Sequence, residues 1–600
     1  METKPPLSES GYADRILRAE EEDERIVLAA RWVLSEFDAY YTESRRIPHR
    51  AKRAFEDRDP GESLRLSRRR LTIYSDSVRD LAAGLKRAFP ALAEEERLWR
   101  KVEGRYLPLV AGRYEEDLAT AFVHSVRRVI YHDEWKPVDY TFGKSARAVS
   151  GDPVEIFRAF PGGARVAPGT VMAILDIPNF SRPYRDAKGD AGRVAERINR
   201  DFGFDGRDPG AVQAIQMVNA GFYRNRGAYL VGRIVLKGWV FAPLVLCLDN
   251  GPEGVFVDAV LTSEADAHNI FSSTLANFHV TNPHYHELAS FLHSIMPRRP
   301  LGLHYSTIGF NHTGKVAVMN ELRDELGATG EVFETAVGFR GTVAIGFSAP
   351  SSAYTLKVIR DAPTEQYKWG KFEGIDSVLR KYGRVHEIDR TGSMLDNIIY
   401  RNVRLNQRWF AADLLDELLT FAAETVSPDG DNLIFKHLIA QPKMVPLPLF
   451  LETASPRDAE TAIVNLGNCI KNNAAADIFN KDLDSRNYGV SRFLKVFLFD
   501  YDAVEPLTAV KVRTNRGRID GEEDIPDWFF EDGVVFLPEE IEVGLQIADR
   551  NLRRLFREVH GDLLTTEYWE GMQRALRAGK VPRINVYPDA RRLGRRALRD

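Results

Sequence analysis

Residues 482–502 read DLDSRNYGVSRFLKVFLFDYD. Asp482 stands five positions before Asn487, and an apolar run at residues 494–499 follows and ends at Asp500. The run has the length and composition of a buried β-strand. Carboxylate and amide oxygens are ligands that Mg²⁺ prefers in proteins. The stretch therefore predicts a loop and a following strand that together supply a divalent-metal site.

The same spacing is typical of a protein-kinase catalytic loop. There an Asp orients the attacking hydroxyl, an Asn five positions later binds Mg²⁺, and a strand leads to the Asp of D-F-G. On this interpretation Asp482 is the catalytic carboxylate, and Asn487 and Asp500 hold the metal. Because a D-x-x-x-x-N pair is common by chance, the interpretation depends on finding the other parts of a phosphoryl-transfer site.

A candidate phosphate cover lies upstream, between two strands predicted within residues 331–347. It consists of Ala336, Val337, Gly338, Phe339, Arg340, Gly341 and Thr342. Glycines three apart let the backbone approach phosphate groups closely. The strand-turn-strand setting favours a kinase-type cover over a P-loop, which leads into a helix. The competing interpretation is an ordinary hairpin turn.

A lone cation, Lys357, follows in a predicted strand at residues 355–359. It matches the Lys of the kinase V-A-I-K strand, which pairs with ATP phosphates. The alternative is a Lys that extends from a sheet edge into solvent. Three residues are candidates for the Glu that pairs with such a Lys, namely Glu365, Glu373 and Glu387. The ordered set predicts a protein kinase that uses ATP and Mg²⁺.

The pattern also departs from a standard eukaryotic-type kinase. Asn480 and Lys481 stand where His-Arg precedes the catalytic Asp, D-Y-D replaces D-F-G, and no A-P-E follows. We therefore expect an atypical kinase.

Composition limits the other function classes. The chain has 600 residues, 44% hydrophobic and 28% charged, which suggests a folded protein of two or more domains. The formal net charge of −4, from 82 basic and 86 acidic residues, argues against nucleic-acid binding. No apolar stretch is long enough to span a bilayer, and residues 1–10 do not resemble a secretory signal, so we expect no membrane partner and a cytoplasmic location.

Hydrophobic periodicity predicts an α+β fold. Residues 14–130 are expected to be mainly helical, and strands are expected at 170–177, 229–234, 239–248 and 254–260, before a long helix at 263–280. Further helices are expected at 409–425, at 459–476 and through 543–578. We expect a mostly helical N-terminal regulatory domain with a small sheet at residues 1–325. A bilobal protein-kinase-like domain with C-terminal helices would occupy residues 326–600.

The chain resembles the isocitrate dehydrogenase kinase/phosphatase family in short motifs over most of its length. In the second half these are residues 338–341, 356–359, 444–447, 475–479, 487–490 and 500–502. Further matching residues are 222–225 and 230–232 in the first half, and 555–556, 560, 562–563 and 568–569 near the C-terminus. The segment between Asp502 and Pro538 resembles the family least.

The resemblance implies a bifunctional enzyme. Such proteins phosphorylate a serine of NADP-dependent isocitrate dehydrogenase, which switches it off, and also remove that phosphate with ADP or ATP bound. This switch divides isocitrate between the citric acid cycle and the glyoxylate bypass. AMP is an implied effector, and a homodimer is compatible with the sequence. The family's phosphatase activity depends on the last Asp of D-R-x-G-x-M-x-D, which is Asp396 here.

Two rival functions are also compatible with parts of the sequence. A metal-dependent hydrolase could use His279, His284, His286 and His293, although a His-rich loop and helix explains them more simply. A kinase-fold pseudoenzyme would bind ATP without turnover. A Cys-x₅-Arg phosphatase is excluded, because Glu253 and Ala475 stand at the Arg positions after the two cysteines. Dephosphorylation would then reuse the nucleotide site, with Asp396 activating water as a general base.

Overall fold

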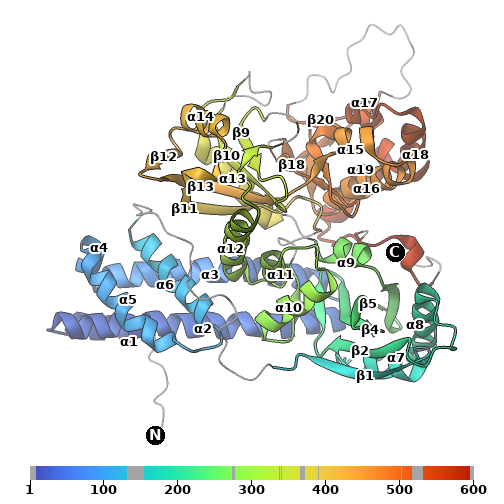
Figure 1. The fold of residues 1–600 in the computed structure, drawn as a ribbon, viewed down its shortest axis with the longest axis horizontal. Helices are drawn as coiled ribbons and strands as arrows, with labels where there is room; N and C mark the ends of the chain where they lie inside the picture. Colours follow the sequence, from blue (N-terminus) through green and yellow to red (C-terminus); the bar gives the residue numbers. More distant parts are fainter. Residues whose placement is uncertain are drawn as a thin grey trace.

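The computed structural model describes residues 9–131, 154–272, 277–336, 338, 341–364, 372–388, 391–501, 503–515, 532–584 and 586–594, with only the backbone of residues 386 and 387. Within these ranges the fold is α+β, as the sequence predicts. Helices dominate the N-terminal part, and two sheet-containing lobes follow above it (Figure 1). None of the described helices combines the length and apolar character needed to cross a bilayer.

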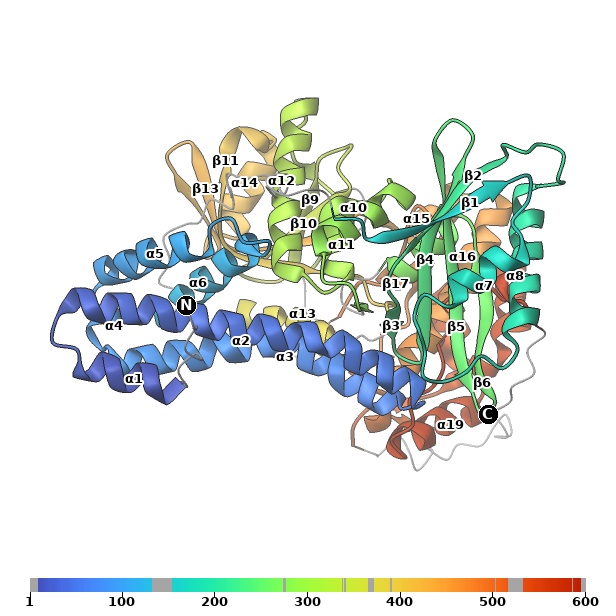
Figure 2. The same ribbon diagram turned by 90° about the horizontal axis from the view of Figure 1, so that it is seen from below.

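Six helices form the N-terminal bundle, as predicted for residues 14–130. They are α1 (Glu9–Arg18), α2 (Glu22–Glu56), α3 (Pro60–Ala88), α4 (Ala91–Glu94), α5 (Glu96–Val110) and α6 (Glu116–Ile130). Apolar residues at three- and four-residue spacing, such as Ile26, Val33 and Phe37, are fully buried between them. The long pair α2 and α3 runs beneath the first lobe and reaches only the near edge of the second (Figures 1 and 2).

A seven-stranded antiparallel sheet follows the bundle. Its strands are β1 (Phe157–Gly163), β2 (Val212–Val218), β3 (Phe222–Arg224), β4 (Gly227–Leu236), β5 (Val240–Gly251), β6 (Gly254–Leu261) and β7 (His279–Val280). The predicted strands at 229–234, 239–248 and 254–260 are confirmed as β4, β5 and β6. Helices α7 (Pro168–Leu175) and α8 (Ala187–Phe202) pack against this sheet in one shared core.

Two predictions in this region were wrong. The run at 170–177 is not a strand but largely helix α7, where Pro168 occupies the first turn and Val171, Ile174 and Leu175 share the buried face. A short apolar run does not distinguish a strand from a buried helix. The helix predicted at 263–280 ends early: α9 spans only Glu264–Phe271, and Val280 pairs instead with Phe222 of β3.

The first lobe of the kinase-like part is a six-stranded sheet. Its strands are β8 (Glu334–Thr335), β9 (Ala344–Ser348), β10 (Tyr354–Ile359), β11 (Ile398–Asn406), β12 (Val426–Asp429) and β13 (Asn432–Pro442). Helix α12 (Asn311–Thr329) shares one hydrophobic core with this sheet, and helix α13 (Ile375–Ile388) packs in the core of the second lobe.

Helix α14 (Ala412–Phe421) is shorter than the helix predicted at 409–425. Trp409 ends a 3₁₀ turn, and Phe410 forms a bridge to Phe333 that places it in the sheet core. Extended pairing at Phe410 therefore delays the start of the helix.

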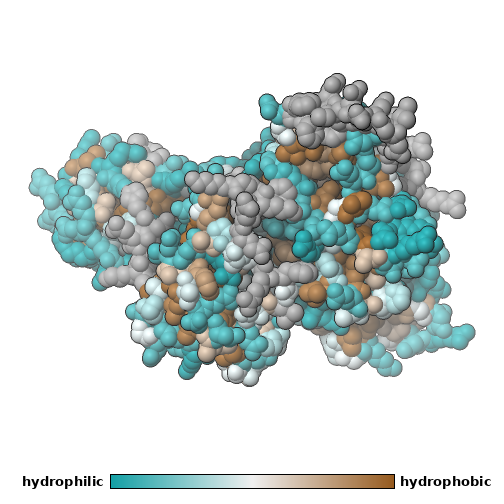
Figure 3. Space-filling model, turned by 90° about the horizontal axis from the view of Figure 1, so that it is seen from above, coloured by the Kyte–Doolittle hydropathy of each residue, from teal (hydrophilic) through white to brown (hydrophobic). Residues whose placement is uncertain are grey.

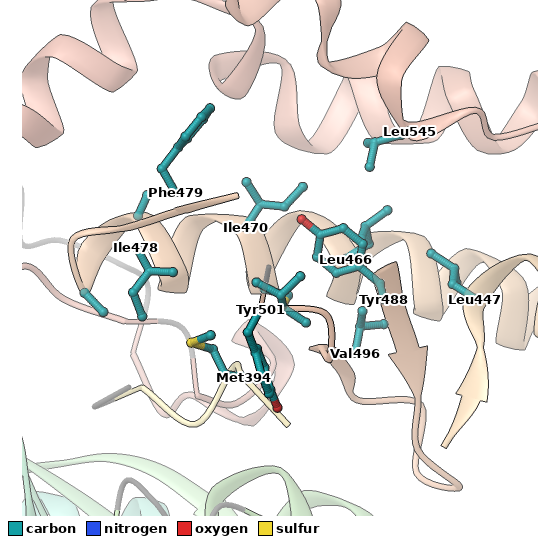
Figure 4. Packing of buried hydrophobic residues seen from close by; sticks show 14 of the residues in the cluster. Met394, Leu447, Leu466, Ile470, Ile478, Phe479, Tyr488, Val496, Tyr501 and Leu545 are labelled. Atoms are coloured by element: carbon teal, nitrogen blue, oxygen red, sulfur yellow. The ribbon is translucent and has the colours of Figure 1, made fainter. Parts of the chain in front are cut away.

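The second lobe is mainly helical, with α15 (Leu447–Thr453), α16 (Pro456–Ala475), α17 (Ile541–Leu545), α18 (Arg550–His560) and α19 (Thr566–Arg577). Figure 4 shows Leu466 and Ile470 of α16 in the core with Tyr488, Val496 and Tyr501. This core supports the segment that carries Asp482, Asn487 and Asp500.

The molecular surface mixes hydrophilic and hydrophobic residues, with brown residues gathered toward the right of the view from above, the side of helices α16 to α19 (Figure 3). Val543 is 78% exposed on α17. Single exposed apolar side chains of this kind are ordinary on a folded protein.

The chain's last described residues return to the N-terminal part (Figure 1). Arg592 forms a bridge with Ala259 of β6 and an ion pair with Asp258. Arg591 pairs with Asp266 of α9 at 2.8 Å. The C-terminal segment thus ties the kinase-like part to the N-terminal sheet.

Candidate active site

The glycine turn joins β8 to β9, as the sequence predicts. These strands pair antiparallel, and the Ala336 amide donates to the Gly346 carbonyl at 2.9 Å. Gly338 has a φ of +138°, and a Cβ there would lie 3.3 Å from Cγ of Pro446. Glycine therefore suits the position both in conformation and in space. Val337, Phe339 and Arg340 lie outside the described residues, while Gly341 and Thr342 lead into β9.

Lys357 lies in a central strand, not at a sheet edge. On β10 it pairs with Gly346 on one side and Ile439 on the other. Its side chain is half-buried, and its Nζ lies 5.5 Å from the centre of the Phe499 ring. Because Phe499 immediately precedes Asp500, the structure brings the lone cation to the end of the predicted metal-binding segment.

The structure describes the side chain of only one of the three candidate glutamate partners of Lys357. The carboxylate of Glu373 is exposed and accepts a hydrogen bond from Ser377 at 3.0 Å. Glu365 lies outside the described residues, as does the side chain of Glu387. The partner of Lys357 therefore stays a prediction.

The loop around Asp482 is held by two amide side chains. It follows strand β15 (Ile478–Asn480), and the amides of Asn480 and Asn487 both donate to the Asp482 carbonyl, at 2.6 and 3.0 Å. The Asp482 amide in turn donates to Oδ1 of Asn480 at 3.1 Å. These bonds fix the backbone of Asp482, whose side chain is half-buried.

A hairpin brings Asn487 and Asp500 together. Strands β16 (Tyr488–Val490) and β17 (Val496–Leu498) pair, and beyond their ends the Phe499 amide donates to the Asn487 carbonyl at 3.0 Å. Since Nδ2 of Asn487 is held by Asp482, Oδ1 is the amide atom that can bind a cation. The amide oxygen of Asn487 and the carboxylate of Asp500, one residue beyond this bond, are both of the hard oxygen type that Mg²⁺ prefers.

Asp396 is almost completely buried, with 2% of its surface exposed. Its segment lies parallel to β17: Met394 forms a bridge with Leu498, and the Leu395 amide donates to the Leu498 carbonyl at 2.7 Å. Asp396 lies two residues after Met394, and Asp500 lies two residues after Leu498. The structure therefore brings the predicted phosphatase residue to the strand that precedes Asp500, the predicted metal ligand.

A buried arginine also interacts with Asp396. Arg299 is 2% exposed, and burial lowers the pKa of its guanidinium to about 10 although the charge of Asp396 opposes this shift. Its guanidinium donates to the Ser272 carbonyl and to the Thr307 hydroxyl, each at 3.1 Å. Sequence reasoning missed Arg299, because nothing in the sequence marks a single arginine that becomes buried through tertiary packing.

The four histidines considered for a metal-dependent hydrolase have different hydrogen-bond partners. His279 is buried beside Ser67, His284 contacts Asn282, His286 contacts Tyr305, and His293 contacts the Arg299 carbonyl. Throughout the described ranges, no group of three or more His, Cys, Asp or Glu side chains is arranged to hold a metal ion. Both cysteines are buried and unlinked.

Two family models match this chain. Residues 331–589 match the family model described as isocitrate dehydrogenase kinase/phosphatase (AceK) kinase domain, and residues 30–330 match the regulatory domain of the same family.

Similar curated proteins carry the same name. A protein of Rhodopseudomonas palustris strain HaA2 named isocitrate dehydrogenase kinase/phosphatase is 51% identical over 587 residues, 97% of this chain and 96% of its own length. A protein of that name from Anaeromyxobacter sp. strain Fw109-5 is 31% identical over 94% of this chain and 97% of its own length. The chain belongs to the isocitrate dehydrogenase kinase/phosphatase family.

Proposed function

We propose that this protein transfers the γ-phosphate of ATP to a serine of NADP-dependent isocitrate dehydrogenase and also removes that phosphate at the same site. The observation that carries the proposal is the meeting of Lys357 with the Asn487–Asp500 hairpin, through Phe499. The proposed division is a regulatory domain at residues 1–325 and a catalytic domain at residues 326–600. By controlling the dehydrogenase, the protein would set the flux between the citric acid cycle and the glyoxylate bypass.

In the kinase direction, Asp482 orients the substrate hydroxyl and accepts its proton. The backbone of residues 336–342 covers the phosphates, and Lys357 pairs with their oxygens. Asn487 and Asp500 are the residues that would hold Mg²⁺, which when bound neutralises charge on the bridging oxygens. Because the loop of Asp482 is fixed by Asn480 and Asn487, little reorganisation is required when substrate arrives.

In the phosphatase direction, Asp396 activates a water as general base, with ADP or ATP bound. The parallel pairing of the Asp396 segment with β17 supports this role, because it joins Asp396 to the strand that ends at Asp500. AMP is the proposed effector. The protein is proposed to act in the cytoplasm without nucleic acid or membrane as partners, and a homodimer is its proposed assembly.

The test is transfer from γ-labelled ATP to purified NADP-dependent isocitrate dehydrogenase, followed by a chase with unlabelled ADP. We expect label on a serine, loss of dehydrogenase activity, and release of inorganic phosphate during the chase. ATP binding with no label on the dehydrogenase would contradict the proposal and favour a pseudoenzyme that only binds its partner.

A further inference from the structure

The hairpin β16–β17 has two ends with different surroundings. Its open end carries Asn487 and Asp500, which the proposed function assigns to the metal. Its tip, residues 491–495, lies on the regulatory domain, against helix α9. A single rigid hairpin therefore connects the proposed metal site to the domain that precedes the catalytic one.

The tip has a specific and strained shape. Leu494 has a φ of +62°, a conformation uncommon for a residue with a branched side chain. Local hydrogen bonds hold it: the Ser491 amide donates to the Lys495 carbonyl at 2.9 Å, and the Lys495 amide donates to the Ser491 hydroxyl at 3.1 Å. Asn465 of α16 donates to the Leu494 carbonyl at 2.8 Å. Strain of this kind persists where surrounding contacts fix the backbone.

This shape directs Lys495 to the C-terminal end of α9. Its Nζ donates to the Asn269 carbonyl and to the Ser272 hydroxyl, each at 2.9 Å. A cation at a helix C-terminus is favoured because the last carbonyl groups carry partial negative charge. Beside it, the Phe493 ring lies 4.4 Å from the ring of His268, between ring centres.

Helix α9 is itself held in the regulatory domain. Arg299 donates to the Ser272 carbonyl at 3.1 Å, and Arg591 pairs with Asp266 at 2.8 Å. Ile270 and Phe271 are fully buried in the core of that domain. A displacement of the regulatory core would therefore displace the surface that receives Lys495.

We propose that Lys495 is a positioning residue through which helix α9 of the regulatory domain fixes the hairpin that carries Asn487 and Asp500. The proposal rests on the proposed function only for the assignment of these two residues to the metal. Lys495 does not contact the reacting atoms. It acts by holding the tip, and the paired strands transmit that position to the metal-binding end.

The test compares Lys495→Met with Arg492→Met in the full-length protein. Both variants remove one positive charge from the tip, and Arg492 is exposed. Mn²⁺ affinity in the presence of ATP is measured by titration calorimetry, and hydrogen exchange is followed in peptides covering residues 487–500. For Lys495→Met we expect about tenfold weaker Mn²⁺ binding, the size usual for losing a residue that orients metal ligands, and faster exchange in the hairpin. Arg492→Met should behave as wild type, and Lys495→Arg should recover most of the affinity.

A double-mutant cycle identifies the contact itself. Ser272→Ala removes one acceptor of Lys495 and should give a smaller loss than Lys495→Met. The double variant should lose no more than Lys495→Met alone, because the bond is already absent. Additive losses, or wild-type Mn²⁺ affinity and exchange in Lys495→Met, would overturn the proposal.

Failure of the proposed function would look different. In that case wild type itself would transfer no phosphate to isocitrate dehydrogenase, whether or not it binds Mn²⁺–ATP. The exchange comparison would still decide whether Lys495 holds the hairpin, since it needs neither metal nor substrate.

Discussion

Tyr501, which follows Asp500, donates the hydrogen bond of its phenol to the backbone carbonyl of Leu395, which precedes Asp396. Its ring also meets that of Tyr382 on helix α13 edge-on, with 5.0 Å between ring centres. One buried side chain thus links the proposed metal-binding segment, the proposed phosphatase segment and a helix of the catalytic lobe. This gives a physical reason for a tyrosine where kinases usually have the Phe of D-F-G.

Tyr501→Phe should destabilise the protein. The substitution keeps the ring but leaves the buried Leu395 carbonyl without this donor, a loss of about 1–3 kcal/mol in the free energy of unfolding. Denaturant titration measures this change, with Tyr12→Phe, in the N-terminal bundle, as the matched control. Equal stability of the two variants would mean that the Tyr501 bond contributes nothing.

Asp482→Asn and Lys357→Met should each abolish phosphorylation of isocitrate dehydrogenase. Loss of a positioned general base typically costs about 10²- to 10⁴-fold in rate. Label transfer from γ-labelled ATP measures the effect, and Glu505→Gln, on the neighbouring strand, serves as control for Asp482→Asn. A variant that folds and keeps most of its activity would contradict the assignment.

Asp396→Asn should remove phosphatase activity and largely preserve kinase activity. The amide keeps the shape of the carboxylate but cannot accept a proton from water. Release of phosphate from prelabelled dehydrogenase and forward label transfer are measured on the same preparation. If both activities fall equally, Asp396 has a structural or shared role.

Gly467→Ala should lower stability by about 1–3 kcal/mol through overpacking. A Cβ at this position would lie 2.1 Å from the ring of His560, so helices α16 and α18 would have to separate. Gly104→Ala on α5 is the matched control, since nothing lies within 4 Å of its Cβ position. There the change should raise stability by up to about 1 kcal/mol, because Ala favours helix. Thermal and denaturant unfolding measure the stability changes of the two variants, which should have opposite signs.

Acidification should destabilise the protein through its buried histidines. Burial lowers the pKa of His437 from 6.5 to about 4, and the Ile359 amide donates to its Nε2 at 3.2 Å. Below pH 6.5 the unfolded chain binds a proton that the folded chain refuses, so stability falls as pH drops from 6.5 to about 4. For one such group the slope reaches about 1.4 kcal/mol per pH unit.

His437→Gln should flatten this dependence, because Gln keeps a hydrogen-bond acceptor and does not titrate. The free energy of unfolding is measured at pH 7.5, 6, 5 and 4.5, with the exposed His49→Gln as control. If the free energy of unfolding of His437→Gln varies with pH as steeply as that of wild type, His437 does not cause the loss of stability on acidification. His279, His312 and His560, whose pKa values burial also lowers, would still contribute to the loss of stability at low pH.

The parts of the candidate site that the sequence predicts are those that depend on short local patterns. These are the spacing of Asp482 and Asn487, the strand before Asp500 and the strand of Lys357. The structure confirms the two strands and brings Lys357 beside Phe499, while the roles of the residues stay predictions. Placing Asp396 depended on family resemblance, because its local sequence suggests a helix cap as readily as a catalytic group. What locates it in space is a parallel pairing with β17, about a hundred residues away.

The features that sequence reasoning missed are tertiary contacts. Arg299 and Lys495 are ordinary cations in the sequence. Folding places Arg299 in a buried position against Ser272 and Thr307, and it places Lys495 at the end of α9. The predicted secondary structure was wrong at 170–177, where a short apolar run fits either a strand or a buried helix. It was also wrong at Val280, where pairing with a distant strand replaces the end of the expected helix.

Helix α9 receives Lys495 at one end and Arg591 on its side, through Asp266. The last described residues of the chain and the hairpin tip are therefore anchored to the same eight-residue helix. A substitution near Arg591 and a substitution at the hairpin tip would thus disturb one common element, although these two segments lie about a hundred residues apart in the sequence.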